Sequence, residues 1–317
     1  GLRDRDGPLM ADSGSTIRVV ALSAGLDHFK DGNPGAEANF AHLMTLAEAC
    51  ISGKPDIIVF PEFAMIGWPY LSAEDVTKLA EPVPGGECYY RQYVELAKKS
   101  GAVVCGWIAE KESDDVLHNS SCLIGPDGNL IGTYRKTHPT ASEEGAWSMA
   151  PGTEIPVFDL GFVKVGIAIC WDMHFPEVCR ALLVQGADMI LHPTIGNDRR
   201  DVCPVRCKEN GLPMVVSIFK EASYAIDVRG NVIADLGDSN GGTLVCDVDP
   251  HTHRSSKYGY NFRERDMTRA RRNPEAYRTL VDTTTRVPWG KVFEDKEGEP
   301  VSEQDLLGKF PKLKKLT

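Results

Sequence analysis

The chain has 317 residues, of which 42% are hydrophobic and 25% charged, and its formal net charge is −10. This length and composition permit a sizeable buried core in a single α/β domain. The acidic balance, with basic residues scattered until the tail, excludes the electrostatic footprint of a nucleic-acid-binding protein. A small molecule is therefore the expected partner.

Residues 1–15 are polar and rich in Gly and Asp, which predicts a flexible N-terminal segment without an apolar stretch for a signal peptide or membrane span. The nine cysteines are an odd number and lie mostly in apolar runs such as 103–105 and 244–246. They indicate reduced core thiols rather than a disulfide framework. We expect a cytoplasmic enzyme with no membrane partner.

The first half of the chain alternates apolar runs with helical periodicity in the order β-α-β-α-β. Two further strands follow around residues 125–128, which have the composition of a hairpin turn. The expected elements are strand 17–22, a helix with apolar residues between 40 and 51, strand 57–60, helix 87–99, and strands 102–109, 118–124 and 130–136.

The second half repeats this order, and no linker rich in Ser, Gly or Pro separates it from the first. Residues 16–250 are therefore expected to form one domain from two similar βαβ-containing halves. The expected elements are strand 163–169, helix 176–185, strand 189–192, helix 199–210, and strands 214–219, 224–228, 232–235 and 243–248.

Residues 251–317 form a charged C-terminal extension without clear periodicity, in which arginines alternate with tyrosines. A segment this long is too long for an ordinary loop. It is expected to pack on the domain or on a neighbouring subunit, and a solvated, partly disordered tail is the alternative.

Cys170 follows the apolar strand 163–169 and precedes a helix that opens at Pro176. A cysteine between a strand end and a helix is presented to a crevice, where backbone N–H groups can stabilise an oxyanion. A cysteine in such a place is more often a core residue. Catalysis would require a base within reach or a positive group that lowers the pKa of the thiol.

Glu62 and Lys136 provide such groups, because each also follows a predicted strand. Taken singly, each is more often a solvated surface residue. If the strand ends belong to one wound sheet, the acid, the lysine and the thiol meet at the same rim. This combination suits acyl transfer: the carboxylate takes the thiol proton, the cation stabilises the oxyanion, and the cysteine forms the acyl-enzyme.

Three motifs resemble the nitrilase superfamily of carbon–nitrogen hydrolases: Phe60-Pro61-Glu62, Tyr134-Arg135-Lys136, and residues 166–172 with Phe175-Pro176-Glu177. The resemblance covers about residues 17–248, with support from 186–188 and from Arg206, Glu209 and Asn210. It implies a four-layer αββα sandwich, a homo-oligomer, no cofactor, and hydrolysis through a thioester or thioimidate. It also implies that the Trp171 backbone N–H joins Lys136 in the oxyanion site.

The superfamily often has a second glutamate that positions the lysine and the attacking water, and Glu143 and Glu144 both qualify. Spacing back from Cys170 favours Glu144, whereas the spacing to Trp147 found in true nitrilases favours Glu143. We assign the role to Glu144.

Other patterns are weaker. His174 lies four residues after Cys170, but the surroundings of a papain-like cysteine are absent. We therefore expect His174 to bind substrate at most, and not to act as a base. Cys203 and Cys207 lack a second ligand pair with zinc spacing, and His251 and His253 are a lone pair on a loop. No metal site is predicted. Neither a phosphate-binding glycine loop nor a dinucleotide motif occurs.

The substrate class depends on less specific residues. Asp172 stands where many true nitrilases carry glutamate, which favours a small or medium amide, with Trp171, His174 and Trp147 as substrate-binding residues. Trp68 and Tyr70 are further candidates for a narrow pocket, or for the core. An N-carbamoyl amine or amino acid is the second choice, for which Arg199 or Arg200 would meet a carboxylate, and a nitrile is the third. An inactive scaffold protein is the non-enzymatic alternative.

Overall fold

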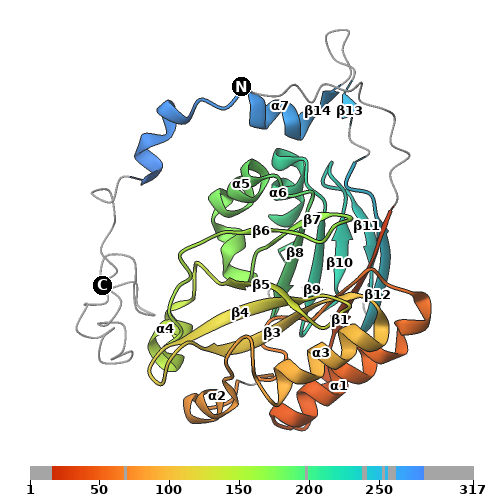
Figure 1. Cartoon of the computed structure of the whole chain (residues 1–317), viewed down its shortest axis with the longest axis vertical. Coiled ribbons are helices and arrows are strands. Elements are labelled where there is room, and N and C mark those ends of the chain that lie inside the picture. The colour runs from red at the N-terminus through yellow and green to blue at the C-terminus, as the bar shows by residue number, and fades with distance from the viewer. Residues whose placement is uncertain are drawn as a thin grey trace.

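The computed structural model describes residues 16–67, 70–196, 199–237, 241–251, 254–255 and 262–281. Two six-stranded sheets pack face to face, and helices cover the outer face of each sheet (Figure 1). The fold is therefore the four-layer αββα sandwich that the sequence predicted.

The first sheet has the order β12-β1-β2-β3-β4-β5. Strands β1, β2 and β3 pair in parallel, whereas β12–β1, β3–β4 and β4–β5 are antiparallel pairs, so β5 runs in the same direction as β2. The strands are β12 (Gly242–Val248), β1 (Ile17–Ser23), β2 (Ile57–Val59), β3 (Val103–Lys111), β4 (Leu117–Ile124) and β5 (Leu130–Arg135).

The second sheet has the order β11-β10-β9-β8-β7-β6, with β7, β8 and β9 in parallel and the remaining pairs antiparallel. The strands are β11 (Val232–Asp235), β10 (Tyr224–Ile226), β9 (Met214–Ile218), β8 (Met189–Thr194), β7 (Lys164–Ile167) and β6 (Val157–Asp159).

The two sheets have the same internal order, as the predicted repeat requires, but the first sheet takes one strand from the end of the second half of the chain. β12 comes from the end of the second half and pairs with β1 over seven residues, from Ile17 opposite Val248 to Ser23 opposite Gly242. In the second sheet, β6 takes the corresponding place beside β7. The first sheet is therefore complete only when the end of the second half has folded against it, whereas the second sheet consists of one continuous stretch of the chain.

Helices α1 (Ala36–Ala49) and α3 (Tyr89–Ser100) lie on the first sheet, and α5 (Pro176–Gln185) and α6 (Cys203–Asn210) lie on the second (Figure 1). All four were predicted, although α6 begins at Cys203 rather than at residue 199. Two short helices and three 3-10 turns were not predicted: α2 (Ala73–Leu79), α4 (Ala141–Trp147), η1 (Leu26–Phe29), η2 (Ile51–Gly53) and η3 (Cys170–His174).

The core consists of three layers of buried side chains. The central layer lies between the sheets and contains β-branched residues from both, including Val19, Val59, Ile167 and Val215. Such strands are buried on both faces, which explains their continuous apolar sequence. The outer layers join the first sheet to α1 and α3 and the second sheet to α5 and α6.

Part of the C-terminal extension packs on the domain. It contains β13 (Arg254–Ser255), β14 (Phe262–Arg263), α7 (Glu264–Ala270) and η5 (Pro274–Val281). Helix α7 contacts α5 and α6, and its buried Arg265 forms a 3.0 Å ion pair with Asp188. Residues 282–317 and 1–15 lie outside the described residues, so predictions about them stay predictions.

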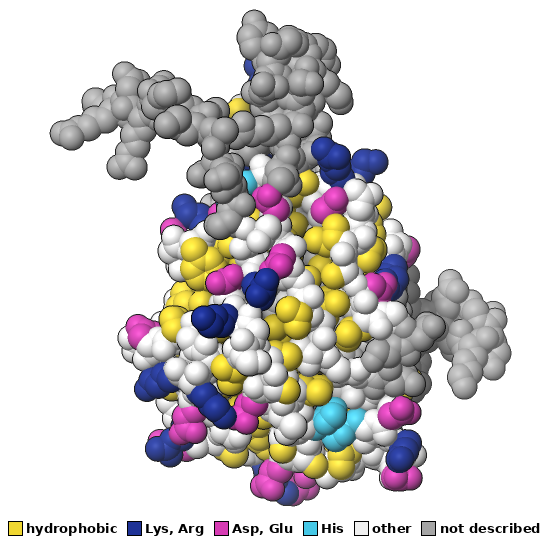
Figure 2. Space-filling view, turned by 90° about the vertical axis from the view of Figure 1, so that its right-hand side faces the viewer, with side chains coloured by type: hydrophobic (Ala, Val, Ile, Leu, Met, Phe, Trp, Pro, Cys, Tyr) yellow, Lys and Arg dark blue, Asp and Glu magenta, His cyan; other side chains and the backbone are white. Residues whose placement is uncertain are grey.

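The state of the cysteines and the distribution of surface charge match what the sequence predicted. All nine cysteines are free thiols, and Cys88 is exposed. Acidic and basic side chains alternate over the face shown in Figure 2. Within the described parts of the chain, no helix is both long enough and apolar enough to cross a membrane.

Candidate active site

The three residues predicted to act together come from strand ends in two sheets. Glu62 follows β2 and Lys136 follows β5 in the first sheet, whereas Cys170 follows β7 in the second. The expectation that all three ends lie in one sheet was wrong. They meet because the sheets pack face to face, with β2 and β5 running in the same direction.

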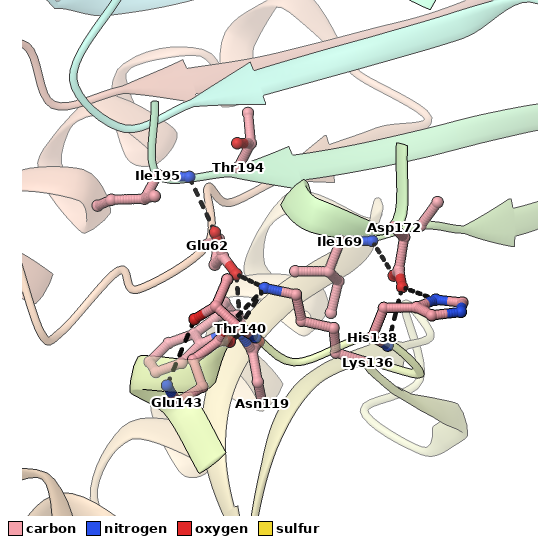
Figure 3. A network of polar contacts seen from close by, with 12 residues as sticks. Glu62, Asn119, Lys136, His138, Thr140, Glu143, Ile169, Asp172, Thr194 and Ile195 are labelled. Atoms are coloured by element: carbon pink, nitrogen blue, oxygen red, sulfur yellow. Dashed lines mark hydrogen bonds and ion pairs between the residues drawn. The ribbon is translucent and has the colours of Figure 1, made fainter. Parts of the chain in front are cut away.

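Glu62 is fully buried and uses both carboxylate oxygens. Its Oε1 accepts hydrogen bonds of 2.8 Å from Lys136 Nζ and 2.8 Å from Asn119 Nδ2. Its Oε2 accepts a 3.1 Å hydrogen bond from the backbone N–H of Ile195, which follows β8 in the second sheet (Figure 3). The carboxylate is thus held from both sheets.

Lys136 is 1% exposed and lies between two carboxylates. Besides Glu62, its Nζ contacts Glu143 at 3.0 Å to Oε1 and 2.9 Å to Oε2 (Figure 3). Glu144, to which we assigned this contact, is only partly buried and has no such bond to the lysine among the described contacts. The structure therefore places Glu143, and not the expected Glu144, in contact with the lysine.

A helix cap explains why Glu143 and not Glu144 reaches the lysine. Thr140 is the N-cap of α4, its hydroxyl accepts from the Glu143 backbone N–H, and Glu143 Oε2 accepts from the Thr140 backbone N–H at 2.6 Å. This reciprocal capping box turns the Glu143 side chain back towards the helix start, where Lys136 lies. Glu144 is rotated about 100° around the helix. The Thr-x-x-Glu pattern was the sequence signal that could have identified Glu143.

Asn119, on β4, belongs to the same network and was missed by the sequence analysis. Its Nδ2 donates to Glu62 and to Glu143, and its Oδ1 accepts a 2.6 Å hydrogen bond from Trp107 Nε1. The Trp107 bond fixes which amide atom faces the two glutamates. An asparagine within a strand carries no motif that would have singled it out.

Cys170 has an unusual backbone conformation, with φ at +44°. Non-glycine residues rarely adopt this left-handed region, and such strain often occurs at functional sites. The chain turns sharply here from β7 into η3, as the predicted elbow requires.

The charges around Cys170 favour a neutral thiol and a basic carboxylate. The pKa of the Cys170 thiol is raised, first by burial and then by Glu62, while Lys136 and a hydrogen bond with Thr194 act in the opposite direction. Burial also raises the pKa of Glu62, against the effect of Lys136. Burial lowers the pKa of Lys136, but Glu143 and Glu62 outweigh it and raise that pKa well above its usual value. Glu62 is therefore a better proton acceptor than a solvated glutamate.

Aromatic side chains line this cluster on one side. Phe63, Tyr70 and Trp147 pack edge to face with ring centroids 5.2–5.6 Å apart. The pKa of Tyr70 is raised, first by burial and then by Glu62 and Cys170, which places its hydroxyl near the cluster. Trp147 is 6% exposed and contacts these rings, and Trp68 lies outside the described residues.

Trp171 and His174 lie on the outer side of the elbow. Trp171 is 38% exposed, and its ring lies 3.6 Å from the His174 ring, centroid to centroid. The pKa of His174 is lowered, first by burial and then by Arg199. Arg200, in contrast, is paired with Asp235 and lies over the Tyr224 ring, so Arg199 is the arginine nearer to His174.

The remaining candidates do not gather into a metal site. Cys203 and Cys207 are buried in the outer core of the second sheet, and His251 contacts Arg265. Within the described ranges, no group of three His, Cys, Asp or Glu side chains is arranged to hold a metal ion. A cavity of about 560 Å³ lies elsewhere, between the starts of α1 and α3 and helix α2, and neither Glu62, Lys136 nor Cys170 lines it.

Comparison with known proteins decides the family. Residues 23–258 match the family model of carbon–nitrogen hydrolases, which is most of the chain. The chain belongs to the carbon–nitrogen hydrolase family. This confirms the nitrilase superfamily of carbon–nitrogen hydrolases that the three motifs predicted, and the relatives of this chain include N-carbamoylputrescine amidases and a nitrilase.

Two curated relatives of this hydrolase cover different shares of it. A nitrilase of Pyrococcus abyssi is 36% identical over 184 residues, which are 57% of this chain and 68% of the relative. An N-carbamoylputrescine amidase of Solanum lycopersicum is 28% identical over 309 residues, covering 86% of this chain and 97% of the relative.

Solved structures share the fold of this hydrolase at low identity. A variant of the amidase from Nesterenkonia sp. AN1 matches with a TM-score of 0.64 and 20% identity, over 88% of this chain and 100% of that one. That structure carries the acetamide moiety of fluoroacetamide covalently attached at its active-site cysteine.

Proposed function

We propose that this hydrolase cleaves the carbon–nitrogen bond of a small linear amide through an acyl-enzyme on Cys170. The observation that carries the proposal is the buried cluster of Lys136 between Glu62 and Glu143, next to Cys170. A buried ammonium with two carboxylates leaves one negative charge in excess. That excess charge suits a site that must accept a proton.

The proposed reaction has two halves. Glu62 takes the Cys170 thiol proton, and the sulfur attacks the carbonyl carbon to form a tetrahedral oxyanion. The oxyanion collapses to a thioester as the carbon–nitrogen bond breaks, and protonated Glu62 gives its proton to the leaving amine or ammonia. Glu62 then takes a proton from water as the water oxygen attacks the thioester carbon. The carbon–sulfur bond breaks, the acid product leaves, and protonated Glu62 returns its proton to the Cys170 thiolate.

Lys136 and the Trp171 backbone N–H are the proposed oxyanion donors. In a water-excluded site, one such donor typically contributes about 3 kcal/mol to transition-state stabilisation. Glu143 holds the ammonium in place through both of its oxygens, and the Asn119 amide donates to both glutamates. Glu143 is thus a positioning residue, whereas Glu62, Lys136 and Cys170 are catalytic.

The rings of Phe63, Tyr70 and Trp147 favour a small acyl group, because they pack closely against each other beside the charged cluster. A second candidate is an N-carbamoyl amine. It is supported by the similarity to an N-carbamoylputrescine amidase over 97% of that protein. A nitrile is the third candidate, and the 36% identity to a nitrilase supports it over a shorter segment.

Other predictions about this protein accompany the proposal. The complete set of Glu62, Lys136 and Cys170 weighs against an inactive scaffold protein. A homo-oligomer and a cytoplasmic location remain predictions, as does independence from a cofactor. The Trp171 and His174 side chains remain candidates for substrate contact at the rim of the elbow.

A substrate panel tests the proposal. The purified protein is assayed for ammonia release from aliphatic amides, N-carbamoyl amines and nitriles, beside its Cys170→Ala variant. We expect turnover to be highest with a small amide and absent in the variant. Predominant turnover of nitriles would reverse the order of substrates, and an active Cys170→Ala protein would remove the proposed nucleophile.

A further inference from the structure

Asp172 is a fully buried carboxylate two residues after Cys170. It accepts hydrogen bonds from five donors, more than the network around Glu62 gives to any one side chain. The donors are Tyr134 Oη (2.8 Å) and the Ile169 N–H (2.8 Å) to Oδ2, and Thr137 Oγ1 (3.2 Å), the His138 N–H (3.2 Å) and His138 Nδ1 (2.9 Å) to Oδ1.

One part of this network closes the turn that contains the nucleophile. The Ile169 N–H donates to Asp172 Oδ2 at 2.8 Å, and the Asp172 N–H donates to the Ile169 carbonyl at 3.0 Å. Cys170 and Trp171 lie between these two residues. The pair of bonds therefore holds Cys170 at its positive φ, a conformation that costs roughly 1 kcal/mol for a residue with a side chain.

The other part reaches the segment that carries the lysine. Tyr134, Thr137 and His138 lie on both sides of Lys136, and all three donate to the same carboxylate. Figure 3 shows the contact between His138 and Asp172. Asp172 therefore joins the end of β5 in the first sheet to the elbow after β7 in the second. This bridge therefore links the segment that carries the Lys136 ammonium to the turn that carries the Cys170 thiol.

His138 contributes both a hydrogen-bond donor and a stacked ring to this bridge. Asp172 Oδ1 can only accept when it is ionised, so His138 Nδ1 carries the hydrogen in this contact. The His138 ring also stacks on Phe175, with centroids 3.7 Å apart and planes at 10°. Phe175 is the N-cap residue of α5. The histidine thus contacts the elbow both at Asp172 and at the start of the next helix.

We propose that His138 and Asp172 are positioning residues that set the placement of the Cys170 thiol and the Trp171 N–H relative to Lys136. The inference rests on the proposed function, because it concerns the placement of the groups that this function assigns to Cys170, Trp171 and Lys136. Neither side chain needs to touch the substrate. Loss of the bridge should therefore lower kcat and leave KM nearly unchanged, since a small displacement of reacting groups reduces the rate strongly.

Two substitutions of His138 separate its hydrogen bond from its ring. His138→Phe keeps the stack on Phe175 and removes the Nδ1 donor, and we expect kcat to fall about tenfold with KM changed less than about threefold. His138→Asn removes the ring but places an amide donor near the Nδ1 position, and we expect it to recover kcat to within about threefold of the native value. His251→Phe is the matched control, because in the described part of the chain the His251 ring contacts Arg265 of α7, away from the elbow, so its loss should leave kcat unchanged.

The alkylation rate of Cys170 gives a readout that needs no substrate. Iodoacetamide labelling followed by peptide mass spectrometry reports Cys170 and the exposed Cys88 in the same sample. In His138→Phe, we expect labelling of Cys170 to slow about fivefold and labelling of Cys88 to stay constant. If His138→Phe does not fold, Thr137→Val removes a donor to the same oxygen at similar shape, with an expected drop in kcat of about threefold.

The outcomes distinguish this inference from the proposed function. An unchanged kcat and unchanged Cys170 labelling in His138→Phe would overturn the inference, as would an Asn variant as slow as the Phe variant. An active Cys170→Ala protein would overturn the proposed function instead. If no substrate is found, the labelling ratio of Cys170 to Cys88 alone decides the inference.

Discussion

Glu62 and Glu143 bind the same ammonium group: Lys136 Nζ lies 2.8 Å from Glu62 Oε1 and 2.9 Å from Glu143 Oε2. The three side chains are exposed by no more than 2%. Buried charges of this kind are stable only when each has a partner, so the lysine cannot be lost without leaving two carboxylates unpaired. In the described part of the chain, the other oxygen of Glu62 accepts its hydrogen bond from the Ile195 N–H.

Glu62→Gln should remove the proposed base while keeping the shape of the side chain. We expect kcat to fall by about 10² to 10⁴, because an amide cannot accept the thiol proton. Steady-state kinetics on the best substrate of the panel, with circular dichroism to verify folding, measures this. A folded variant with more than a tenth of the native kcat would exclude Glu62 as the base.

Glu143→Gln and Glu144→Gln should differ, because only Glu143 contacts Lys136. We expect kcat to fall about 10-fold to 100-fold in Glu143→Gln and to change less than about twofold in Glu144→Gln. Parallel kinetics of the two variants serves as its own control. The reverse order would restore Glu144 as the second glutamate.

Lys136→Met should destabilise the protein in a manner that depends on pH. Removing the ammonium leaves Glu62 and Glu143 buried together, at an expected cost of about 3–5 kcal/mol at pH 8. Burial already raises the pKa of Glu62, and Lys136 opposes that shift, so the variant should raise the pKa further. A carboxyl with a raised pKa binds its proton more tightly when folded, so stability falls as pH rises.

Urea unfolding of native protein and Lys136→Met at pH 5 and pH 8 tests this expectation. The difference in the free energy of unfolding should be smaller at pH 5, where the carboxyls take up protons. An equal difference at both values of pH would show that lost packing, and not unpaired charge, destabilises the variant.

Because of Glu144, the free energy of unfolding of the native protein should decrease as the pH rises from acidic to alkaline values. Burial and the nearby Glu143 raise the pKa of Glu144 to about 7. The folded state therefore favours the protonated form, and stability is lost as pH rises from the ordinary glutamate range through 7. Glu144→Gln should be more stable than native protein at pH 8 by roughly 1 kcal/mol, allowing for solvent screening of a half-buried group.

Thermal or urea unfolding of Glu144→Gln at pH 4.5 and pH 8 measures this gain, which should nearly vanish at the lower pH. The exposed Glu154 provides the control, because Glu154→Gln removes the same charge from the surface and should change stability little at either pH. A gain at pH 8 that matched the control would assign the effect to net charge alone.

Much of the architecture could be predicted because it depends on local pattern. A short, continuous apolar run predicts a strand that is buried on both faces, as at 57–60 and 189–192. A proline at the first helical position predicts the start of a helix, as at Pro176. Helices α2 and α4 were missed because seven residues show too little periodicity. The place of β12 beside β1 was also missed, since pairing between strands over two hundred residues apart leaves no local trace.

The sequence by itself determined the family: Glu62, Lys136 and Cys170 each follow a predicted strand in a recognisable motif, and the three motifs together are typical of carbon–nitrogen hydrolases. The tertiary structure decided the partners. Which glutamate meets Lys136 depends on the direction that the α4 cap gives to Glu143, and the bridge from Asp172 to His138 depends on the packing of two sheets. Hydrogen bonds act over about 3 Å, so residues far apart in sequence become partners only when folding places their atoms within that distance.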